Sequence, residues 1–333
     1  MVDDKKVAVE VSGWLRVYEG GSVDRTWTGP PEYKFLTEPA PPHNHFIDGV
    51  AIRDVTSNSG DVRVRIYLPE KQPDDSEKLP ILLHLHGGGF CISVADWYMH
   101  YQFYARLART ARVICVSAFL RLAPEHPLPA ACDDGYEALR WLASSEGRAE
   151  PWLQSHADFN RVFLIGDSSG ANLVHELAAR AGRDDSLTQI TLAGAIPIHP
   201  GFLYSTRSKS EMEQPESPFL TLDMVDQFLA FALPAGSNKD HPITCPMGPA
   251  APPLESLKLP PMLLCVTDLD LIKDTQMEYY EAMKKAGKDV ELLMNYKVGH
   301  SFYFNKIAVD SDPDTAAQTA DLISGIASFI NKH

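Results

Sequence analysis

The chain has 333 residues, of which 44% are hydrophobic and 22% are charged, and its formal net charge is −14 at pH 7. This length and composition predict a globular protein with one large α/β domain or two small ones. The acidic balance and the lack of a basic stripe argue against nucleic acid and anionic membranes as partners. No apolar run is as long as a membrane span, so we expect no transmembrane helix.

The first residues and the cysteines favour a cytoplasmic protein. The N-terminal run MVDDKK leads into no apolar segment, and we therefore expect no signal peptide. The five cysteines are scattered and form no C-x-x-C pair. Cys115 and Cys265 lie in apolar, strand-like runs, where buried free thiols are usual, and a reducing compartment suits them.

Residues 1–45 are polar and contain several prolines, and we interpret them as an N-terminal arm that folds over another part of the protein. Within this arm, residues 7–17 fit either a helix or an extended segment. Residues 46–55 and 62–68 both alternate apolar and polar side chains, and the turn-rich link SNSG lies between them. This alternation predicts an antiparallel β-hairpin.

Residues 79–85 form an apolar run typical of a buried strand, and this run leads directly into HGGGF at residues 86–90. Three successive glycines let the backbone approach a ligand closely, with N–H groups pointing at it. That is how an oxyanion hole is built when no side chain supplies the donors. Further along we predict a helix at 97–109, a buried strand at 113–117 and a helix at 130–144.

Residues 162–165 have the pattern of a short buried strand and lead into GDSSG, which fits G-x-S-x-G. Good helix formers follow at residues 171–181. Strand, tight turn and helix are the context of a nucleophile elbow, in which the central serine projects its hydroxyl from the end of a sheet. Ser168 is therefore the candidate nucleophile, and the backbone N–H of Ser169, at the start of the helix, can face an oxyanion.

The second half of the chain alternates strands and helices with one interruption. Predicted strands are 192–198, 261–267 and 290–294, and predicted helices are 274–286 and 315–332. Residues 200–250 break this rhythm with loops around a helical stretch at 219–231, and an insertion of this length is usually a functional lid. The alternation predicts a mostly parallel sheet covered on both faces, with ligands at the carboxyl ends of its strands.

Two later strand ends supply an acid and a base for Ser168. Three carboxylates compete after one predicted strand, namely Asp268, Asp270 and Asp274. Asp274 precedes a helix and is suited to cap it. His300 follows the next strand, where it could take the serine proton and return it to a leaving alcohol. The order Ser, Asp, His is that of an α/β-hydrolase triad and differs from the orders in the two major serine-protease folds.

Together these motifs resemble the plant carboxylesterase branch of the hormone-sensitive-lipase family, from about residue 40 to the end of the chain. The matching runs are HGGGF at 86–90, RLAPEHP at 121–127, GDSSG at 166–170, DLIKD at 270–274 and GHSF at 299–302. In the N-terminal arm, SGWLRV and DRTWTGPP further resemble the tobacco hypersensitivity-related proteins, whose close relatives include carboxylesterases that degrade strigolactones.

The resemblance implies a single α/β-hydrolase domain over residues 1–333, with a mostly parallel central sheet and helices on both faces. It also implies a cap built from residues 1–45 and from the insertion at 200–250.

The same resemblance assigns the site residues one by one. In the family motif D-x-L-x-D the first aspartate is the triad acid, which selects Asp270 to act with Ser168 and His300. The oxyanion donors map to the backbone N–H groups of Gly88, Gly89 and Ser169. Ser169 stands where the family commonly has Ala, and we expect little effect because the residue acts through its backbone.

The implied activity is hydrolysis of small lipophilic esters or lactones through an acyl-enzyme, with strigolactones as candidates through the resemblance alone. No cofactor and no metal are expected. Candidate substrate-binding residues are the aromatic side chains of Phe90, Phe202, Phe219, Phe231 and Tyr303.

Two rival functions remain open, a hormone receptor and a lyase such as 2-hydroxyisoflavanone dehydratase. The gibberellin receptors of this fold have lost the triad histidine, which is present here as His300. The legume dehydratases carry Thr at the nucleophile position, where this chain has Ser168.

Overall fold

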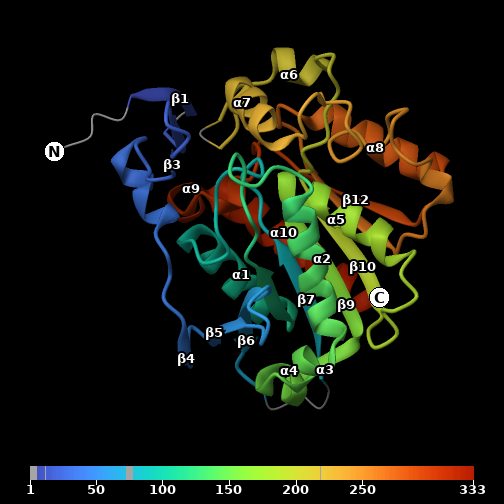
Figure 1. The fold of residues 1–333 in the computed structure, drawn as a ribbon. Helices are drawn as coiled ribbons and strands as arrows, with labels where there is room; N and C mark the ends of the chain where they lie inside the picture. Colours follow the sequence, from blue (N-terminus) through green and yellow to red (C-terminus); the bar gives the residue numbers. More distant parts are fainter. Residues whose placement is uncertain (1–5, 12, 73–77, 218) are drawn as a thin grey trace.

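The computed structural model describes residues 6–11, 13–72, 78–217 and 219–333. Its main element is a nine-stranded sheet in the order β12-β11-β10-β9-β7-β8-β6-β5-β4 (Figure 1). Neighbours from β12 to β8 run parallel, whereas β6, β5 and β4 are antiparallel to their neighbours. The strands are β4 (His43–Ile47), β5 (Val50–Thr56), β6 (Arg63–Pro69), β7 (Leu79–Leu85), β8 (Ile114–Ala118), β9 (Ala157–Asp167), β10 (Leu192–Ile198), β11 (Met262–Thr267) and β12 (Val290–Asn295).

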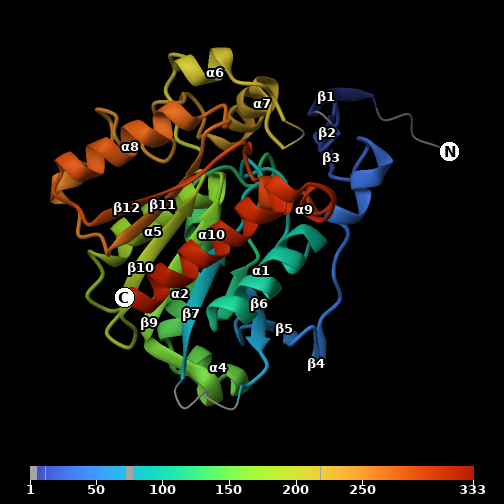
Figure 2. The same ribbon diagram turned by 180° about the vertical axis from the view of Figure 1, so that it is seen from behind.

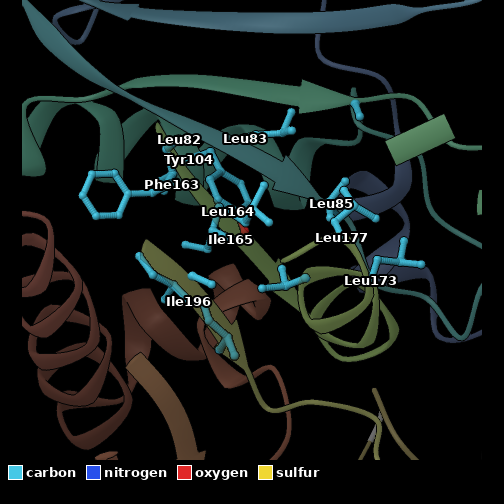
Figure 3. Close-up of a cluster of buried hydrophobic side chains, with 14 of the residues drawn as sticks. Leu82, Leu83, Leu85, Tyr104, Phe163, Leu164, Ile165, Leu173, Leu177 and Ile196 are labelled. Atoms are coloured by element: carbon cyan, nitrogen blue, oxygen red, sulfur yellow. The ribbon is translucent and has the colours of Figure 1, made fainter. Parts of the chain in front are cut away.

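The central strands are mainly apolar because the sheet is covered on both faces. Figure 3 shows side chains of β7 and β9 meeting Leu173 and Leu177, all of them buried. The predicted hairpin and the predicted parallel strands are confirmed. Two strand boundaries differ from the prediction. The hairpin strand begins at Val50 rather than Phe46, because Asp48 and Gly49 turn the chain between β4 and β5. Strand β9 begins at Ala157 rather than Val162, because Ala157 and Asp158 pair with Leu79 and Pro80 of β7.

Helices cover both faces of the sheet. The longer ones are α1 (Tyr98–Ala111), α2 (Ala130–Ala143), α5 (Ser169–Ala181), α8 (Lys273–Lys285) and α10 (Pro313–Lys332). Helices α1 and α10 pack together on one face (Figure 2). Helices α2 and α5 lie on the other (Figure 1), where His175 of α5 is hydrogen-bonded to Tyr279 of α8. In the described part of the chain, no helix has the length and apolarity needed to cross a membrane.

The shorter helical elements complete the fold. They are α3 (Ser145–Ala149), α4 (Pro151–His156), α6 (Lys209–Glu213), α7 (Leu222–Ala232), α9 (Lys306–Ser311) and the 3-10 turns η1 (Pro31–Thr37), η2 (Leu254–Ser256) and η3 (Phe302–Phe304). Helix α7 corresponds to the helix predicted within the insertion.

The described residues of the segment 7–17 in the N-terminal arm are extended rather than helical. The arm forms a small antiparallel sheet of β1 (Val7–Val11), β2 (Leu15–Tyr18) and β3 (Val23–Asp24), and β1 contacts α7 (Figure 1). Arg25 fastens the arm to the main body. Its guanidinium donates to the Glu125 carboxylate at 2.8 and 2.5 Å and to the carbonyl of Cys91 at 2.6 Å. Two segments far apart in sequence therefore meet over the carboxyl ends of the parallel strands.

Candidate active site

Ser168 lies at the turn between β9 and α5 with φ 52° and ψ −123°, a backbone conformation that a residue with a Cβ rarely adopts. The turn is fixed from both sides, since the N–H of Ser168 donates to the Ile198 carbonyl at 2.9 Å. Its own carbonyl accepts from Gly201 at 3.2 Å. The flanking glycines are required by space: a Cβ on Gly166 would lie 2.5 Å from the carbonyl oxygen of Gly170. The strand, turn and helix thus place the serine as the sequence predicted.

Asp270 and His300 are brought together below this turn. Nδ1 of His300 lies 2.8 Å from Oδ2 of Asp270, and Asp270 is completely buried. Because a carboxylate only accepts, Nδ1 carries the proton and Nε2 has the free lone pair. The same carboxylate accepts from Gln276 at 3.0 Å and from the N–H of Ile272 at 3.1 Å. Burial raises the pKa of Asp270, but the charge and hydrogen bond of His300 outweigh it and the pKa ends below its ordinary value.

The two competing carboxylates have other partners. Asp268 accepts from the backbone N–H of Lys297 at 2.7 Å. Asp274 lies in the first turn of α8 and accepts from the N–H of Ser210 at 2.8 Å, which ties the insertion to α8. Of the three, Asp270 is therefore the aspartate in contact with His300.

The glycine run forms a tight loop beside Ser168. Gly88 and Gly89 have φ of 103° and 59°. A Cβ on Gly88 would lie 2.3 Å from the carbonyl oxygen of Ile92, and one on Gly89 would lie 2.4 Å from the ring of Phe228. Both positions therefore favour glycine, and a Cβ on the neighbouring Gly87 would lie 3.2 Å from that of Ser168, so the loop passes beside the serine.

The hydroxyl of Ser169 has a use that the sequence did not suggest. Its Oγ accepts a hydrogen bond from the backbone N–H of Phe90 at 3.2 Å, which links the glycine loop to the elbow. The N–H of Ser169 is at the first position of α5, where helix geometry supplies no acceptor. One residue thus presents a donor at the helix end and holds the facing loop.

A pocket runs from Ser168 and His300 toward the N-terminal arm and α7. Its apolar lining consists of Trp14, Phe90, Ile92, Trp97, Met99, Leu203, Phe219, Leu220, Met224, Val225, Phe228, Leu229, Ile272 and Phe304. Its polar lining consists of Gly87, Gly88, Gly89, Ser93, His100, Asp167, Ser168, Ser169, Gly201, His300 and Ser301. Nε2 of His300 is buried and has no hydrogen-bond partner in the described part of the chain. The imidazole therefore holds a free acceptor in the same apolar pocket as the serine.

A family described as having the alpha/beta hydrolase fold matches residues 82–304. The chain belongs to the alpha/beta hydrolase family. Among similar relatives of this hydrolase is 2-hydroxyisoflavanone dehydratase of Glycyrrhiza echinata, which is 36% identical and aligned over 98% of this chain and 97% of its own length.

Other relatives of the hydrolase differ in their named functions. Probable carboxylesterase 6 of Arabidopsis thaliana is 34% identical over 89% of this chain and 84% of its own length. Gibberellin receptor GID1B, also of Arabidopsis thaliana, is 34% identical over 81% of this chain and 77% of its own length. A solved esterase of Pyrobaculum calidifontis has a TM-score of 0.67 at 26% identity and covers 84% of both chains. The family is therefore shared by esterases, a receptor and a dehydratase.

The aromatic residues predicted to bind substrate divide into two groups. Phe90 and Phe219 line the pocket of the hydrolase, but Phe202, Phe231 and Tyr303 do not. Phe202 is completely buried against Tyr279, with ring centroids 4.6 Å apart, because the chain turns inward after β10.

The other two predicted residues, Tyr303 and Phe231, also lie away from the pocket. Tyr303 is also completely buried, with its ring 4.4 Å from those of Phe103 and Phe304. Phe231 is half-buried near the end of α7, beyond the turn that faces the pocket.

Trp14 and Trp97 line the pocket although neither was among the predicted substrate-binding residues. Their rings stack 6.3 Å apart at 16°, and Trp14 also meets Trp27 edge-on at 4.5 Å. Trp14 comes from the arm, and its contact with Phe219 of the insertion joins the two parts of the expected cap. The run SGWLRV, which includes Trp14 and carries the resemblance of the arm, was the signal available in the sequence.

Among the described residues, two buried groups have ligand atoms close enough to hold a metal ion, namely His84, His100 and Asp167, and His199, Asp270 and His300. In the first group, one ring nitrogen of each histidine already has a hydrogen-bond partner within the protein. His84 lies 2.6 Å from the Ser117 hydroxyl, and His100 lies 2.6 Å from that of Ser93. The second group is the candidate triad pair with one further histidine.

Proposed function

We propose that this hydrolase cleaves carboxylic esters through Ser168, His300 and Asp270. The observation that carries the proposal is the His300 to Asp270 hydrogen bond of 2.8 Å, which leaves Nε2 free in the pocket that Ser168 also lines. A histidine held in this tautomer is what a serine hydroxyl needs as a general base.

In the proposed reaction, Nε2 of His300 removes the proton as Ser168 Oγ attacks the ester carbonyl. The oxyanion that forms accepts hydrogen bonds from the N–H groups of Gly88, Gly89 and Ser169. His300 then gives the proton to the leaving alkoxide, and an acyl-enzyme remains. Water repeats the sequence, releases the acid and restores the serine.

The pocket lining supports small, uncharged substrates. Its walls are mainly aromatic and aliphatic, and Asp167 is the one carboxylate among the described lining residues, which include no lysine or arginine. An anionic substrate would lose its hydration here without gaining a partner of opposite charge, and burial raises the pKa of Asp167, which makes its charge a weak attraction for a cation. We therefore propose small lipophilic esters or lactones. Strigolactones are candidates through the resemblance of the N-terminal arm.

The triad is tested with p-nitrophenyl butyrate and a fluorophosphonate that labels activated serines. We expect turnover and a single adduct on Ser168 in the wild type, and loss of both in Ser168→Ala. Turnover that survives in Ser168→Ala would exclude the proposed nucleophile. A panel of strigolactones and generic esters, followed by mass spectrometry, then identifies the preferred acyl group.

A dehydratase is the second candidate, because the relative from Glycyrrhiza echinata aligns over nearly the whole chain. Loss of water from a 2-hydroxyisoflavanone needs a base but no acyl-enzyme. If Ser168→Ala dehydrated this substrate as fast as the wild type while esters were not cleaved, the dehydratase would be favoured. A cytoplasmic location remains a prediction, which a fluorescent fusion in plant cells would test.

A further inference from the structure

His199 lies immediately beyond β10, in the middle of the proposed catalytic machinery. Strand β10 pairs with β9, which leads to Ser168, and with β11, which leads to Asp270. His199 is completely buried and has φ 46°, a conformation uncommon for a residue other than glycine. Its N–H donates to the Cys265 carbonyl of β11 at 2.9 Å. A buried, strained residue at this position calls for a reason, because strain of this kind persists only where the surroundings impose it.

The side chain of His199 holds the loop that carries His300. The backbone N–H of Ser301, the residue directly after His300, donates to Nδ1 of His199 at 3.0 Å. Nδ1 therefore has the lone pair, and a neutral ring carries its proton on Nε2. Burial lowers the pKa of His199 to about 3, so the ring is neutral near pH 7 and its Nδ1 remains an acceptor.

The His199 ring also lies beside the catalytic pair. Its centroid is 5.7 Å from that of His300. One ring nitrogen of each histidine and one carboxylate oxygen of Asp270 all lie within 4.8 Å of one another. Nε2 of His199 is buried and has no hydrogen-bond partner in the described part of the chain. His199 is not among the pocket-lining residues, so it acts on the site through its neighbours rather than through substrate.

We propose that His199 is a positioning residue, whose Nδ1 fixes the Ser301 backbone and thereby the orientation of the His300 ring between Asp270 and Ser168. This inference rests on the proposed ester hydrolysis. Ser301 itself has φ 53°, and its carbonyl accepts from the N–H of Phe304 at 3.0 Å, so the turn after His300 is tight. The bond to His199 ties this turn to β10, the strand between those that lead to the nucleophile and the acid.

Three substitutions of His199 test the proposal. Asparagine carries an amide oxygen at nearly the position of Nδ1 and tolerates positive φ, so His199→Asn should keep the bond to Ser301. Phenylalanine keeps a ring of similar size without an acceptor. Glutamine moves the amide one carbon further along the side chain, so His199→Gln provides a second loss of the acceptor if His199→Phe does not fold. Circular dichroism and thermal unfolding compare the folded fractions.

The assay measures kcat for p-nitrophenyl butyrate, corrected for the fraction of protein that is folded. We expect His199→Phe and His199→Gln to lower kcat about 10- to 100-fold, because a misplacement of about 1 Å at a catalytic group can cost 100-fold. KM should change less than about threefold, since no substrate contact is removed. His199→Asn should keep kcat within about threefold of wild type. A wild-type kcat in His199→Phe, or equal losses in His199→Asn and the other two variants, would overturn the proposal.

A second measurement separates this inference from the proposed function. The proton on Nδ1 of His300, hydrogen-bonded to Asp270, should give a downfield 1H NMR signal that exchanges slowly with water. We expect the signal in wild type and His199→Asn, and its broadening or loss in His199→Phe. This readout needs no turnover. An inactive wild type that shows this pattern would reject ester hydrolysis but keep the positioning role, whereas an unchanged signal in His199→Phe would reject the role.

Discussion

Gly88→Ala is the most direct test of the glycine loop. A Cβ at this position would lie 2.3 Å from the Ile92 carbonyl oxygen and 2.9 Å from the carbonyl carbon, whereas ordinary contacts begin at 3.4 Å. Backbone atoms cannot rotate away as a side chain can, so the loop must shift by about 1 Å. The N–H of Gly88 would then leave the position proposed for an oxyanion donor. Loss of one such donor costs about 100- to 1,000-fold in kcat.

The assay is steady-state hydrolysis of p-nitrophenyl butyrate, with the amount of folded protein measured by circular dichroism. We expect kcat to fall about 100-fold in Gly88→Ala with a smaller change in KM. The matched control is Gly60→Ala in the turn between β5 and β6. Gly60 also has positive φ, at 82°, but a Cβ there meets nothing within 4 Å.

Both alanine variants bear backbone strain, because a residue with a Cβ rarely adopts positive φ. Only Gly88→Ala moves the loop beside Ser168. A kcat within threefold of wild type in a folded Gly88→Ala variant would refute the assignment of this N–H to the oxyanion hole. An equal drop in kcat for Gly60→Ala would instead point to a general effect of strain.

Three further outcomes are expected. Ser169→Ala removes the acceptor for the Phe90 N–H. Because one hydrogen bond contributes about 1 kcal/mol, we expect kcat to fall about 3- to 10-fold. An unchanged kcat would show that the glycine loop keeps its position without this hydrogen bond. Arg25→Met breaks the contacts with Glu125 and should make the N-terminal arm more sensitive to limited chymotrypsin digestion at unchanged overall fold; cleavage at the wild-type rate would contradict this anchoring role. Burial lowers the pKa of His175 from 6.5 to about 4. Between these two pH values the histidine is protonated in the unfolded chain but neutral in the folded chain, so the folded state loses stability as the pH falls. The free energy of unfolding by urea should therefore drop by about 2 kcal/mol more in wild type than in His175→Phe between pH 7 and pH 4.5, and parallel pH profiles would exclude this cause.

The strand ends were the most predictable part of the structure. Buried parallel strands are continuous apolar runs, so their carboxyl ends can be located in the sequence to within a residue or two. Ser168 and His300 each follow such a run, and GDSSG places the serine at the strand-to-helix turn. The structure brings His300 to Asp270 and places Ser168 in the same pocket. The choice of Asp270 over Asp268 came from the resemblance, because both follow the same strand.

Contacts between distant segments were not predictable from local pattern. Phe202 and Tyr303 have the residue type expected in an apolar pocket, but the core takes the same type, and only tertiary packing separates the two. Trp14 lies 83 residues before Trp97, and no periodicity links them. His199 directly follows a predicted strand, so its position gave a signal. Its contact with Ser301 still depends on a loop that begins about 100 residues later.

The joining of the N-terminal arm to the insertion also bears on how the protein is made. Trp14 leaves the ribosome before Phe219, which it contacts and which follows more than 200 residues later in the chain. The small sheet of the arm thus cannot reach its final packing until most of the chain has been translated. His300 emerges later still. Under the proposed function, a chain that is still being translated would lack its general base and stay inactive at least until His300 has left the ribosome.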